Sequence, residues 1–452
     1  MFCKLLANND LCAQLSKVSF NQPYVSPCTL SSVTDVLRNK NLSGNGLLSK
    51  ECEKLVQTQI TCDHALLTNS CTAALEIAAI LCDLKPGDEV IMPSFTFVST
   101  ALAFVRVNAV PVFVDIRPDT KNINEALIEE AINERTKAIV VVHYAGIMAE
   151  MNNVAALAKK YNLILIEDAA QSYLSSYQSR NAGTFGDLAT FSFHETKNIS
   201  CGEGGALLIN NENFLERAEI IREKGTDRQN FLSGAIDKYT WTDLGSSFVA
   251  SEITAAVLRP QLVNAHYITN KRISIWNYYM DAFSSLHLGK HISLPHVPEE
   301  CSHNGHMFYL VMQNKQCRDE FIKNMKLKGI QCAFHHVPLH SSPAGKHFMT
   351  NDFNKLMDGP ADHPYATTVL WTKVIQVNDD GTENFEDGQG PIIFNDLVPT
   401  GALLSEIKPK FATALTTDVI SQMIDQIFAY KTFGVRYSLT DREWRVILNN
   451  NL

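Results

Sequence analysis

Between about residues 64 and 210, short apolar runs rich in β-branched residues alternate with segments whose apolar residues have helical spacing. Nearly continuous apolar runs of this length are typical of strands that are buried on both faces. The alternation of the two patterns predicts an α/β domain with a mainly parallel sheet. The expected strands lie at 89–95, 110–116, 138–146, 163–170, 188–193 and 205–209, and the expected helices at 74–84, 124–133 and 151–162.

The pattern changes after about residue 250. Residues 250–285 read as helix, and two strand-like runs at 306–313 and 330–340 flank a helix at about 317–328, which indicates a smaller α+β domain. The following residues, 349–404, are rich in acidic and turn-forming residues and read as loops, and 416–430 is an amphipathic helix candidate. We therefore expect a large domain at 1–260, a small domain at 261–348 and a divergent segment at 349–452.

Composition narrows the class of protein. The net charge of −9 argues against a nucleic-acid binder but is compatible with a small anionic ligand held by local groups. The eleven cysteines include no CxxC pair, so we expect a reduced protein without a disulfide framework or a metal site. The first 17 residues do not resemble a signal peptide, and no uninterrupted apolar run is long enough to cross a membrane. These features predict a cytoplasmic protein.

Several polar or aromatic residues directly follow the apolar runs. Ligands of parallel α/β sheets bind beyond the carboxyl ends of the strands, so side chains in these positions are candidate site residues. They are Phe97, His143, Asp168, Gln171 and His194.

The stretch from Asn69 to Thr72 leads into a predicted helix. Free backbone N–H groups at a helix start favour a phosphate. The alternative is an ordinary N-cap made by Ser70 or Thr72. The glycines at 202–205 lack the spacing of a dinucleotide fingerprint and favour a tight turn.

Asp168 and Lys197 each allow two interpretations. Asp168, at the end of a buried strand, is either the N-cap of the next helix or an anion paired with a cationic ring nitrogen. Lys197 is either a solvated surface residue or an amine that forms a Schiff base. A helix start for a phosphate, an aromatic ring, a strand-end carboxylate and a lysine are together what pyridoxal 5′-phosphate requires.

At these positions the sequence resembles the DegT/DnrJ/StrS-type nucleotide-sugar aminotransferases, which are fold type I pyridoxal-phosphate enzymes. The resemblance runs from about residue 18 to 348. It implies a seven-stranded, mainly parallel sheet and a smaller C-terminal α+β domain. The motifs that carry it are GDEVIMPSFTFVST, VFVDIRPDT, VHYAG, EDAAQS, FSFHETKN, GEGGALL, AEIIREKGT, DKYTW, LGSS and FHHVPLHSSPAG.

The resemblance also implies roles for individual residues. Lys197 would be the Schiff-base lysine, Asp168 would pair with the pyridine nitrogen, Gln171 would contact the ring hydroxyl and Phe97 would stack on the ring. The phosphate would be held by Cys71, Thr72 and Ser192, together with Ser247 where most members have an asparagine from the partner subunit. The sugar site would be lined by His143, Tyr144, His194 and His340.

The closest motifs belong to a subgroup that acts on TDP-4-keto-6-deoxy-D-glucose. The implied reaction uses L-glutamate and yields a TDP-4-amino-4,6-dideoxyhexose and 2-oxoglutarate, for a surface polysaccharide such as lipopolysaccharide or common antigen. The implied assembly is a homodimer that shares its active sites. The alternatives are amination of another keto-sugar nucleotide, or a catalytically silent binding protein on the same fold. Resemblance ends near residue 348, so 349–452 is either an insertion with an extension or a foreign module.

Overall fold

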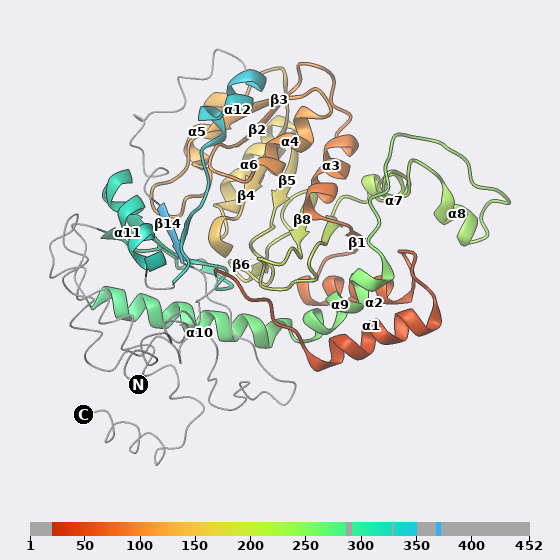
Figure 1. Ribbon diagram of the computed structural model, residues 1–452. Coiled ribbons are helices and arrows are strands. Elements are labelled where there is room, and N and C mark those ends of the chain that lie inside the picture. The colour runs from red at the N-terminus through yellow and green to blue at the C-terminus, as the bar shows by residue number, and fades with distance from the viewer. Residues whose placement is uncertain (1–19, 286–291, 328–329, 350–367, 372–452) are drawn as a thin grey trace, which may run out of the picture.

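The computed structural model describes residues 20–285, 292–327, 330–349 and 368–371, and its centre is a seven-stranded sheet (Figure 1). The strand order is β1-β9-β8-β5-β4-β2-β3. Only β9 runs antiparallel to its neighbours; the other pairs are parallel. The strands are β1 His64–Thr68, β2 Glu89–Pro93, β3 Val110–Val114, β4 Thr136–Val142, β5 Ile164–Asp168, β8 Leu188–Ser192 and β9 Gly205–Ile209. The predicted α/β fold with a mostly parallel seven-stranded sheet is confirmed.

Helices cover both faces of this sheet, which explains the continuous apolar runs. In β4, Ile139 and Val141 pack into the core on one face, whereas Ala138 and Val140 pack into the core on the other. The first face is covered by α2 Leu47–Ile60, α5 Glu125–Ala131, α6 Met151–Tyr161 and α9 Glu252–Val263. The second is covered by α3 Cys71–Leu81, α4 Val98–Val105 and α7 Leu215–Arg222.

The strand β1 was not among the expected strands. Its five residues, HALLT, lie between α2 and α3, and a run this short gives little periodic signal. It pairs along its whole length with β9, from His64 opposite Ile209 to Thr68 opposite Gly205. The tertiary pairing therefore defines this strand more than its own sequence does.

The buried carboxylate of Glu252 stabilises the edge of the domain near β1. The helix α2 begins after Gly46, which offers no side chain as a cap. Glu252, from the start of α9, accepts hydrogen bonds from the N–H groups of Gly46, Leu48 and Ser49 at 2.9–3.1 Å. A distant side chain thus supplies the acceptor that the N-terminus of α2 requires. Helix α1 Pro27–Asn39 packs beside α9 on the same edge.

The predicted long helix at 250–285 is two helices. Helix α9 ends at Val263, and α10 Ala265–Ser284 begins after Asn264. Figure 1 shows α10 running from the large domain towards the second sheet.

The second sheet has four short strands in the order β10-β12-β14-β13. The predicted strand at 306–313 is β12 and the predicted helix is α11, whereas the run at 330–340 contains only a two-residue strand. The elements are β10 Ile292–Ser293, β12 Phe308–Met312, α11 Lys315–Leu327, β13 Ala333–Phe334, η4 Leu339–Ser341, α12 Pro343–Phe348 and β14 Thr368–Trp371.

Strand β14 lies beyond residue 348, where loops were expected. It pairs antiparallel with β12 on one side and with β13 on the other. The other expectations for 350–452, including the helix at 416–430, lie outside the described residues, as do the N-terminal residues 1–19.

Three short strands form a small third sheet that joins the two larger ones. The order is β11 Cys301–Ser302, β6 Ser176–Tyr177 and β7 Arg180–Asn181. Since β6 follows β5, and β11 lies between β10 and β12 of the four-stranded sheet, this small sheet holds the connection between β10 and β12 near the carboxyl end of β5.

An arm extends from the large domain after α7. It contains the short helix α8 Arg228–Leu232 and projects away from the body of the molecule (Figure 1). The arm returns to the large domain near Ser247, which pairs with Glu223.

No helix among the described residues is long and apolar enough to cross a membrane. The nine cysteines in the described part of the chain are all free.

Candidate active site

Lys197 lies in the loop between β8 and β9. The loop is closed by backbone hydrogen bonds from Phe193 N–H to the Gly204 carbonyl, at 2.8 Å, and from Lys197 N–H to the His194 carbonyl, at 2.9 Å. Burial lowers the pKa of the Lys197 amine, although the Cys71 thiol and the Asp168 carboxylate act to raise it. A lysine with a lowered pKa is a better nucleophile because more of it is neutral.

Asp168 ends β5 and is 5% exposed. Its carboxylate accepts hydrogen bonds from Thr100 Oγ1 at 2.7 Å and from Ala170 N–H at 3.2 Å. Burial raises the pKa of Asp168, although these hydrogen bonds and the charge of Lys197 oppose the rise. A buried carboxylate held only by neutral donors is suited to a cationic ring nitrogen, which would favour its ionised form.

The N-terminus of α3 combines the two interpretations of its sequence. Ser70 is the N-cap, because its Oγ accepts the Ala73 N–H at 3.0 Å. The N–H groups of Cys71 and Thr72 have no acceptor among the described residues. The helix start also rests against Gly205, where a Cβ would lie 2.4 Å from Cys71 N. The cap thus leaves two N–H groups available to a phosphate.

Helix α4 connects the helix start to the carboxylate. Ser99 Oγ lies 2.7 Å from Thr72 Oγ1, and the next residue, Thr100, donates to Asp168. Sequence analysis missed both Ser99 and Thr100; the available signal was their place at the start of a helix that follows a strand end. Phe97 is the N-cap residue of α4 and is 59% exposed, so its ring face is open to a ligand.

Ser192 and Gln171 are both buried beside these groups. Ser192 is the last residue of β8 and pairs with Gly205, the residue against which α3 begins. The Gln171 side chain accepts a hydrogen bond from Ala145 N–H at 2.7 Å, which leaves its amide N–H₂ as the free donor.

His143 faces the interior. Its Nε2 lies 2.9 Å from Glu167 Oε2, and its Nδ1 accepts the Ala149 N–H at 3.2 Å. The ring is fully buried, and both nitrogens are used, so His143 has no nitrogen left for a sugar. Its backbone N–H donates to the Asp168 carbonyl at 3.2 Å, so His143 helps to hold the end of β5.

Tyr144 belongs to an aromatic cluster that includes two histidines missed by the sequence analysis. The Tyr144 hydroxyl lies 3.1 Å from His335 Nδ1, and the His335 and His336 rings are 3.5 Å apart. Burial and the charge of Lys197 both lower the pKa of His336, to about 3, so its ring is neutral near pH 7. The signal for these two residues was the HH pair in the motif FHHVPLH. From that motif only His340 was selected as a candidate site residue. That residue bonds to Ser94, which follows β2, with Nδ1 and Oγ 2.6 Å apart.

His194 and Ser247 lie at the rim. His194 is half-buried, with Nε2 3.6 Å from Glu203 Oε1 and Nδ1 3.0 Å from Thr196 Oγ1. Ser247 is exposed, and its carbonyl accepts a hydrogen bond from Asn69, two residues before Cys71, at 3.0 Å.

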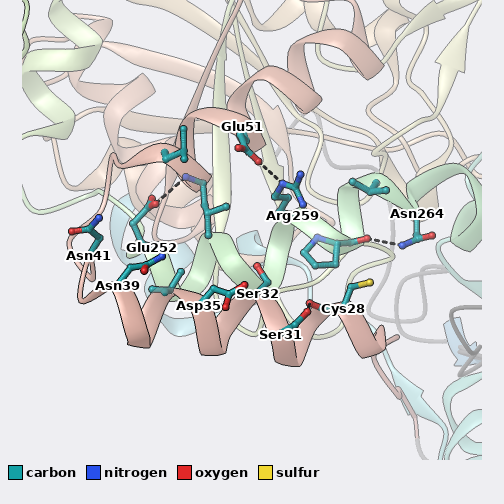
Figure 2. Close-up of a pocket in the computed structure, with 15 residues that line it drawn as sticks. Cys28, Ser31, Ser32, Asp35, Asn39, Asn41, Glu51, Glu252, Arg259 and Asn264 are labelled. Carbon is teal, nitrogen blue, oxygen red and sulfur yellow. Dashed lines mark hydrogen bonds and ion pairs between the residues drawn. The ribbon is translucent and has the colours of Figure 1, made fainter.

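A cavity of about 530 Å³ lies between α1, α2 and α9, and Figure 2 shows the polar side chains around it. Glu51 and Arg259 form an ion pair there. None of the predicted site residues lines this cavity, so it is separate from the Lys197 region.

The residues around Lys197 fit pyridoxal phosphate. Open N–H groups at a helix start suit its phosphate, the buried Asp168 carboxylate suits its ring nitrogen, and Lys197 suits its aldehyde. No group of His, Cys, Asp and Glu side chains able to hold a metal ion occurs in the described part of the chain.

Comparison with known proteins places the chain in a family. The model of the DegT/DnrJ/EryC1/StrS aminotransferases matches residues 26–363. The chain belongs to this family. GDP-perosamine synthase of Caulobacter vibrioides is 31% identical over 346 residues, which cover 75% of this chain and 90% of the relative. An uncharacterized protein of Methanocaldococcus jannaschii is 34% identical over 335 residues, 72% of this chain and 86% of that one.

Solved structures agree with the family. PseC of Helicobacter pylori, an aminotransferase involved in the biosynthesis of pseudaminic acid, superposes with a TM-score of 0.71 at 26% identity, covering 78% of this chain and 93% of PseC. DesV of S. venezuelae gives a TM-score of 0.69 at 26% identity and covers 87% and 100% of the two chains. This member of the family is a pyridoxal-phosphate-dependent nucleotide-sugar aminotransferase with the fold type I architecture.

Proposed function

We propose that the enzyme transfers the amino group of L-glutamate to C4 of TDP-4-keto-6-deoxy-D-glucose. The products are a TDP-4-amino-4,6-dideoxyhexose and 2-oxoglutarate, used in a surface polysaccharide. The observation that carries the proposal is the buried group of Lys197, Asp168 and Cys71 at the ends of β8, β5 and the start of α3. The choice of a TDP-linked 4-keto sugar rests on motifs such as SFHETKN.

Each residue of the group has a separate task. The bound cofactor supplies an electron sink for the carbanion that forms at the amino donor. Lys197 holds the cofactor covalently and, once released, moves a proton at the donor Cα. Asp168 holds a proton at the ring nitrogen, and Phe97 packs against the ring.

The phosphate would be held by the start of α3 and its neighbours. The N–H groups of Cys71 and Thr72 and the hydroxyls of Thr72 and Ser192 are the donors. The Cys71 thiol is not a nucleophile, because burial and the nearby Asp168 raise its pKa to about 12. Gln171 would give its free amide N–H₂ to the ring hydroxyl.

The sugar would lie over Tyr144, His194 and His340. His143, with both ring nitrogens used, holds the end of β5 through its backbone N–H rather than touching the sugar. The neutral His335 and His336, whose pKa values burial lowers, add hydrogen-bonding groups to this side of the site.

A homodimer is supported by the arm after α7. Apolar side chains that project into solvent commonly mark an interface. Trp241, which pairs with Thr226 near the base of the arm, is 80% exposed, and Leu244 is 65% exposed. The placement of Ser247, at the base of the arm, near the cofactor phosphate of the partner rests on the family resemblance alone, since within one chain its carbonyl accepts a hydrogen bond from Asn69. Sedimentation of the native enzyme and of Trp241→Asp tests this arrangement: a dimer that the substitution dissociates supports it.

The function is tested first by spectroscopy and then by product analysis. Enzyme mixed with pyridoxal phosphate should give a visible absorbance band that L-glutamate bleaches; a chain without the band would be a silent relative. Mass spectrometry of the sugar product, followed by NMR at C4, then tests the position of the amino group.

A second substrate class is a GDP-linked keto sugar, favoured by the 31% identity to GDP-perosamine synthase. Turnover with TDP-linked and GDP-linked 4-keto-6-deoxy sugars, compared as kcat/KM, separates the two. Preference for the GDP-linked sugar would replace the TDP-linked substrate without altering the chemistry.

A further inference from the structure

A buried polar network joins Asn198, the residue after Lys197, to the segment between β11 and β12. Asn198, Asn304 and His306 are each almost fully buried. Asn198 Nδ2 donates to the Asn304 carbonyl at 2.8 Å, and His306 Nδ1 lies 3.0 Å from Asn198 Oδ1. His306 N–H in turn donates to Asn304 Oδ1 at 3.0 Å. The three residues therefore form a closed ring of hydrogen bonds.

The network defines the tautomer of His306. Asn198 uses its N–H₂ on the Asn304 carbonyl, so the oxygen faces His306 and can only accept. His306 Nδ1 must then carry the proton. Burial and the charges of Lys197 and Arg272 lower the pKa of His306 well below its usual value, so the ring is neutral.

The far side of the network is held by α10. Arg272 is 4% exposed and donates to the carbonyls of Gly305, at 3.2 Å, and His306, at 2.6 Å. Gly305 has a φ of +61°, and a Cβ there would lie 2.8 Å from the Arg272 backbone. The glycine thus lets the chain run directly against α10.

The near side is held by the loop after β5. Asn304 Nδ2 donates to the carbonyls of Gln171 at 2.9 Å and Tyr173 at 3.0 Å. Gly146, with a φ of +80°, leaves room for Asn304 Oδ1, which a Cβ would approach to 2.0 Å. The segment 303–306 is therefore fixed between α10, the Gln171 loop and the Lys197 loop. Two residues later the chain forms β12.

We propose that His306 is a positioning residue for Lys197, which it holds through the hydrogen bond to Asn198. The backbone of Lys197 is fixed from one side by its own hydrogen bond to the His194 carbonyl and from the other by Asn198. Through this contact the placement of β12 and α10 decides where the amine lies. The inference rests on the proposed role of Lys197 as the cofactor lysine.

The test uses three substitutions of His306 that keep, shift or remove the hydrogen-bond donor facing Asn198. In His306→Asn the amide nitrogen can take the place of Nδ1, so the hydrogen bond to Asn198 is kept. In His306→Gln the donor is one methylene farther out, near the place of Nε2, and in His306→Phe the ring remains without a donor. His303→Phe is the matched control: it removes one hydrogen bond of the same segment, from Gly305 N–H to His303 Nδ1 at 3.1 Å, but leaves the bond between His306 and Asn198 in place. The His303 ring packs on Trp276, with ring centroids 4.2 Å apart, and a phenyl ring can keep that contact.

The readouts are pyridoxal-phosphate affinity and the pH dependence of the visible band, recorded on cofactor-depleted full-length protein. Cys71 and Asp168 are the titratable groups that affect the pKa of the Lys197 amine. The charge of Lys197 in turn lowers the pKa values of His306, His335 and His336. All except His306 remain in every variant. Thermal unfolding without cofactor reports any general loss of packing.

We expect His306→Phe and His306→Gln to weaken cofactor binding about five- to tenfold, since one hydrogen bond is lost. The pH at which the band forms half-maximally should move upward, because a less constrained amine reaches solvent and regains its usual pKa. His306→Asn and His303→Phe should stay within about twofold of the native protein. Asn198→Ala combined with His306→Phe should cost no more than Asn198→Ala alone, because Asn198→Ala already removes the hydrogen bond to His306 together with that to the Asn304 carbonyl.

Native affinity and an unshifted pH midpoint in His306→Gln would overturn the inference, as would an equal loss in His303→Phe. Should His306→Phe not fold, the comparison of His306→Asn with His306→Gln decides the question. Absence of the visible band in the native protein would remove the proposed function, and the inference with it. A native band together with unaffected variants would remove only the inference.

Discussion

The seven-stranded and four-stranded sheets differ in how well their strands can be predicted from the local sequence. The strands of the seven-stranded sheet have five residues each, or seven in β4, and helices cover both faces, so most of their side chains are apolar. The four-stranded sheet contains two strands of only two residues each, and β14 comes from beyond the predicted small domain. Burial on both faces leaves a local signal, whereas pairing between distant short segments does not.

The candidate active site lies where the two sheets meet. Lys197, Asp168 and the start of α3 belong to the large sheet, and each follows or precedes one of its strands. His306 and His335 come from the chain that forms the small sheet. Substitutions and a truncation can therefore disturb either sheet, or the contacts between them, separately.

The largest effect is expected from Lys197→Ala. Turnover should fall by on the order of a thousandfold or more, and the visible band should be lost, because no other amine replaces the nucleophile. Stability should change little, because the Lys197 amine makes no hydrogen bond or ion pair among the described residues, so its removal leaves no partner unsatisfied. Steady-state kinetics and thermal unfolding measure the two effects. Lys137→Ala, at an exposed lysine, is the control, and an active Lys197→Ala protein would refute the assignment.

Removal of β14 should affect the small sheet alone. A chain that ends at Phe348 loses the strand that pairs with both β12 and β13. With about 0.5–1.5 kcal/mol for each backbone hydrogen bond, the free energy of unfolding should fall by about 4 kcal/mol or more. Denaturant unfolding measures this against a chain that ends at Trp371. Equal stability of the two chains would show that β14 contributes nothing.

Gly205→Ala should disturb the start of α3 from within the large sheet. The new Cβ would lie 2.4 Å from Cys71 N, so the helix start must move and pyridoxal-phosphate binding should weaken about tenfold. Gly87→Ala is the control: its φ of +91° costs about 1 kcal/mol of stability, but open space surrounds it. Affinity is read by titration of the visible band. A tenfold loss in the control as well would mean that α3 is not the cause.

The smallest effect is expected from Asp119→Asn, at the junction of the sheets. Arg117 forms an ion pair with Asp119 at 2.8 Å, and the Tyr309 hydroxyl of β12 donates to the Asp119 carbonyl at 3.5 Å. The hydrogen bond from Arg117 lowers the pKa of Asp119 to about 2. The stabilisation is therefore present above the usual carboxylate pKa near 4 and is lost as the pH falls through about 2.

The pair is partly exposed, so the loss of stability at pH 7 should be at most about 1 kcal/mol. Denaturant unfolding of native and Asp119→Asn proteins across pH 2–7 measures it. A difference between the two proteins that persisted unchanged at the lowest pH would contradict the electrostatic origin.

The position of Asp168 at the end of a buried strand could be predicted from the apolar run before it, and the structure places it at the end of β5. Ser192, which ends β8, was selected only through the family resemblance, and the roles of both residues stay predictions. His143 also follows a strand, but the structure turns its ring towards Glu167, because a one-residue step decides on which face a side chain lies. Thr100 and His335 were missed because each reaches the site through a contact with a residue far away in the sequence.

The sequence by itself determined the large sheet, the helices that cover it and the residues whose chemistry suits pyridoxal phosphate. Local patterns sufficed there because the spacing of apolar residues records burial directly. Only the tertiary structure decided that β1 pairs with β9, that β14 completes the small sheet and that His306 meets Asn198. These contacts join residues remote from one another, and their free energy depends on the geometry of the folded chain rather than on any local pattern.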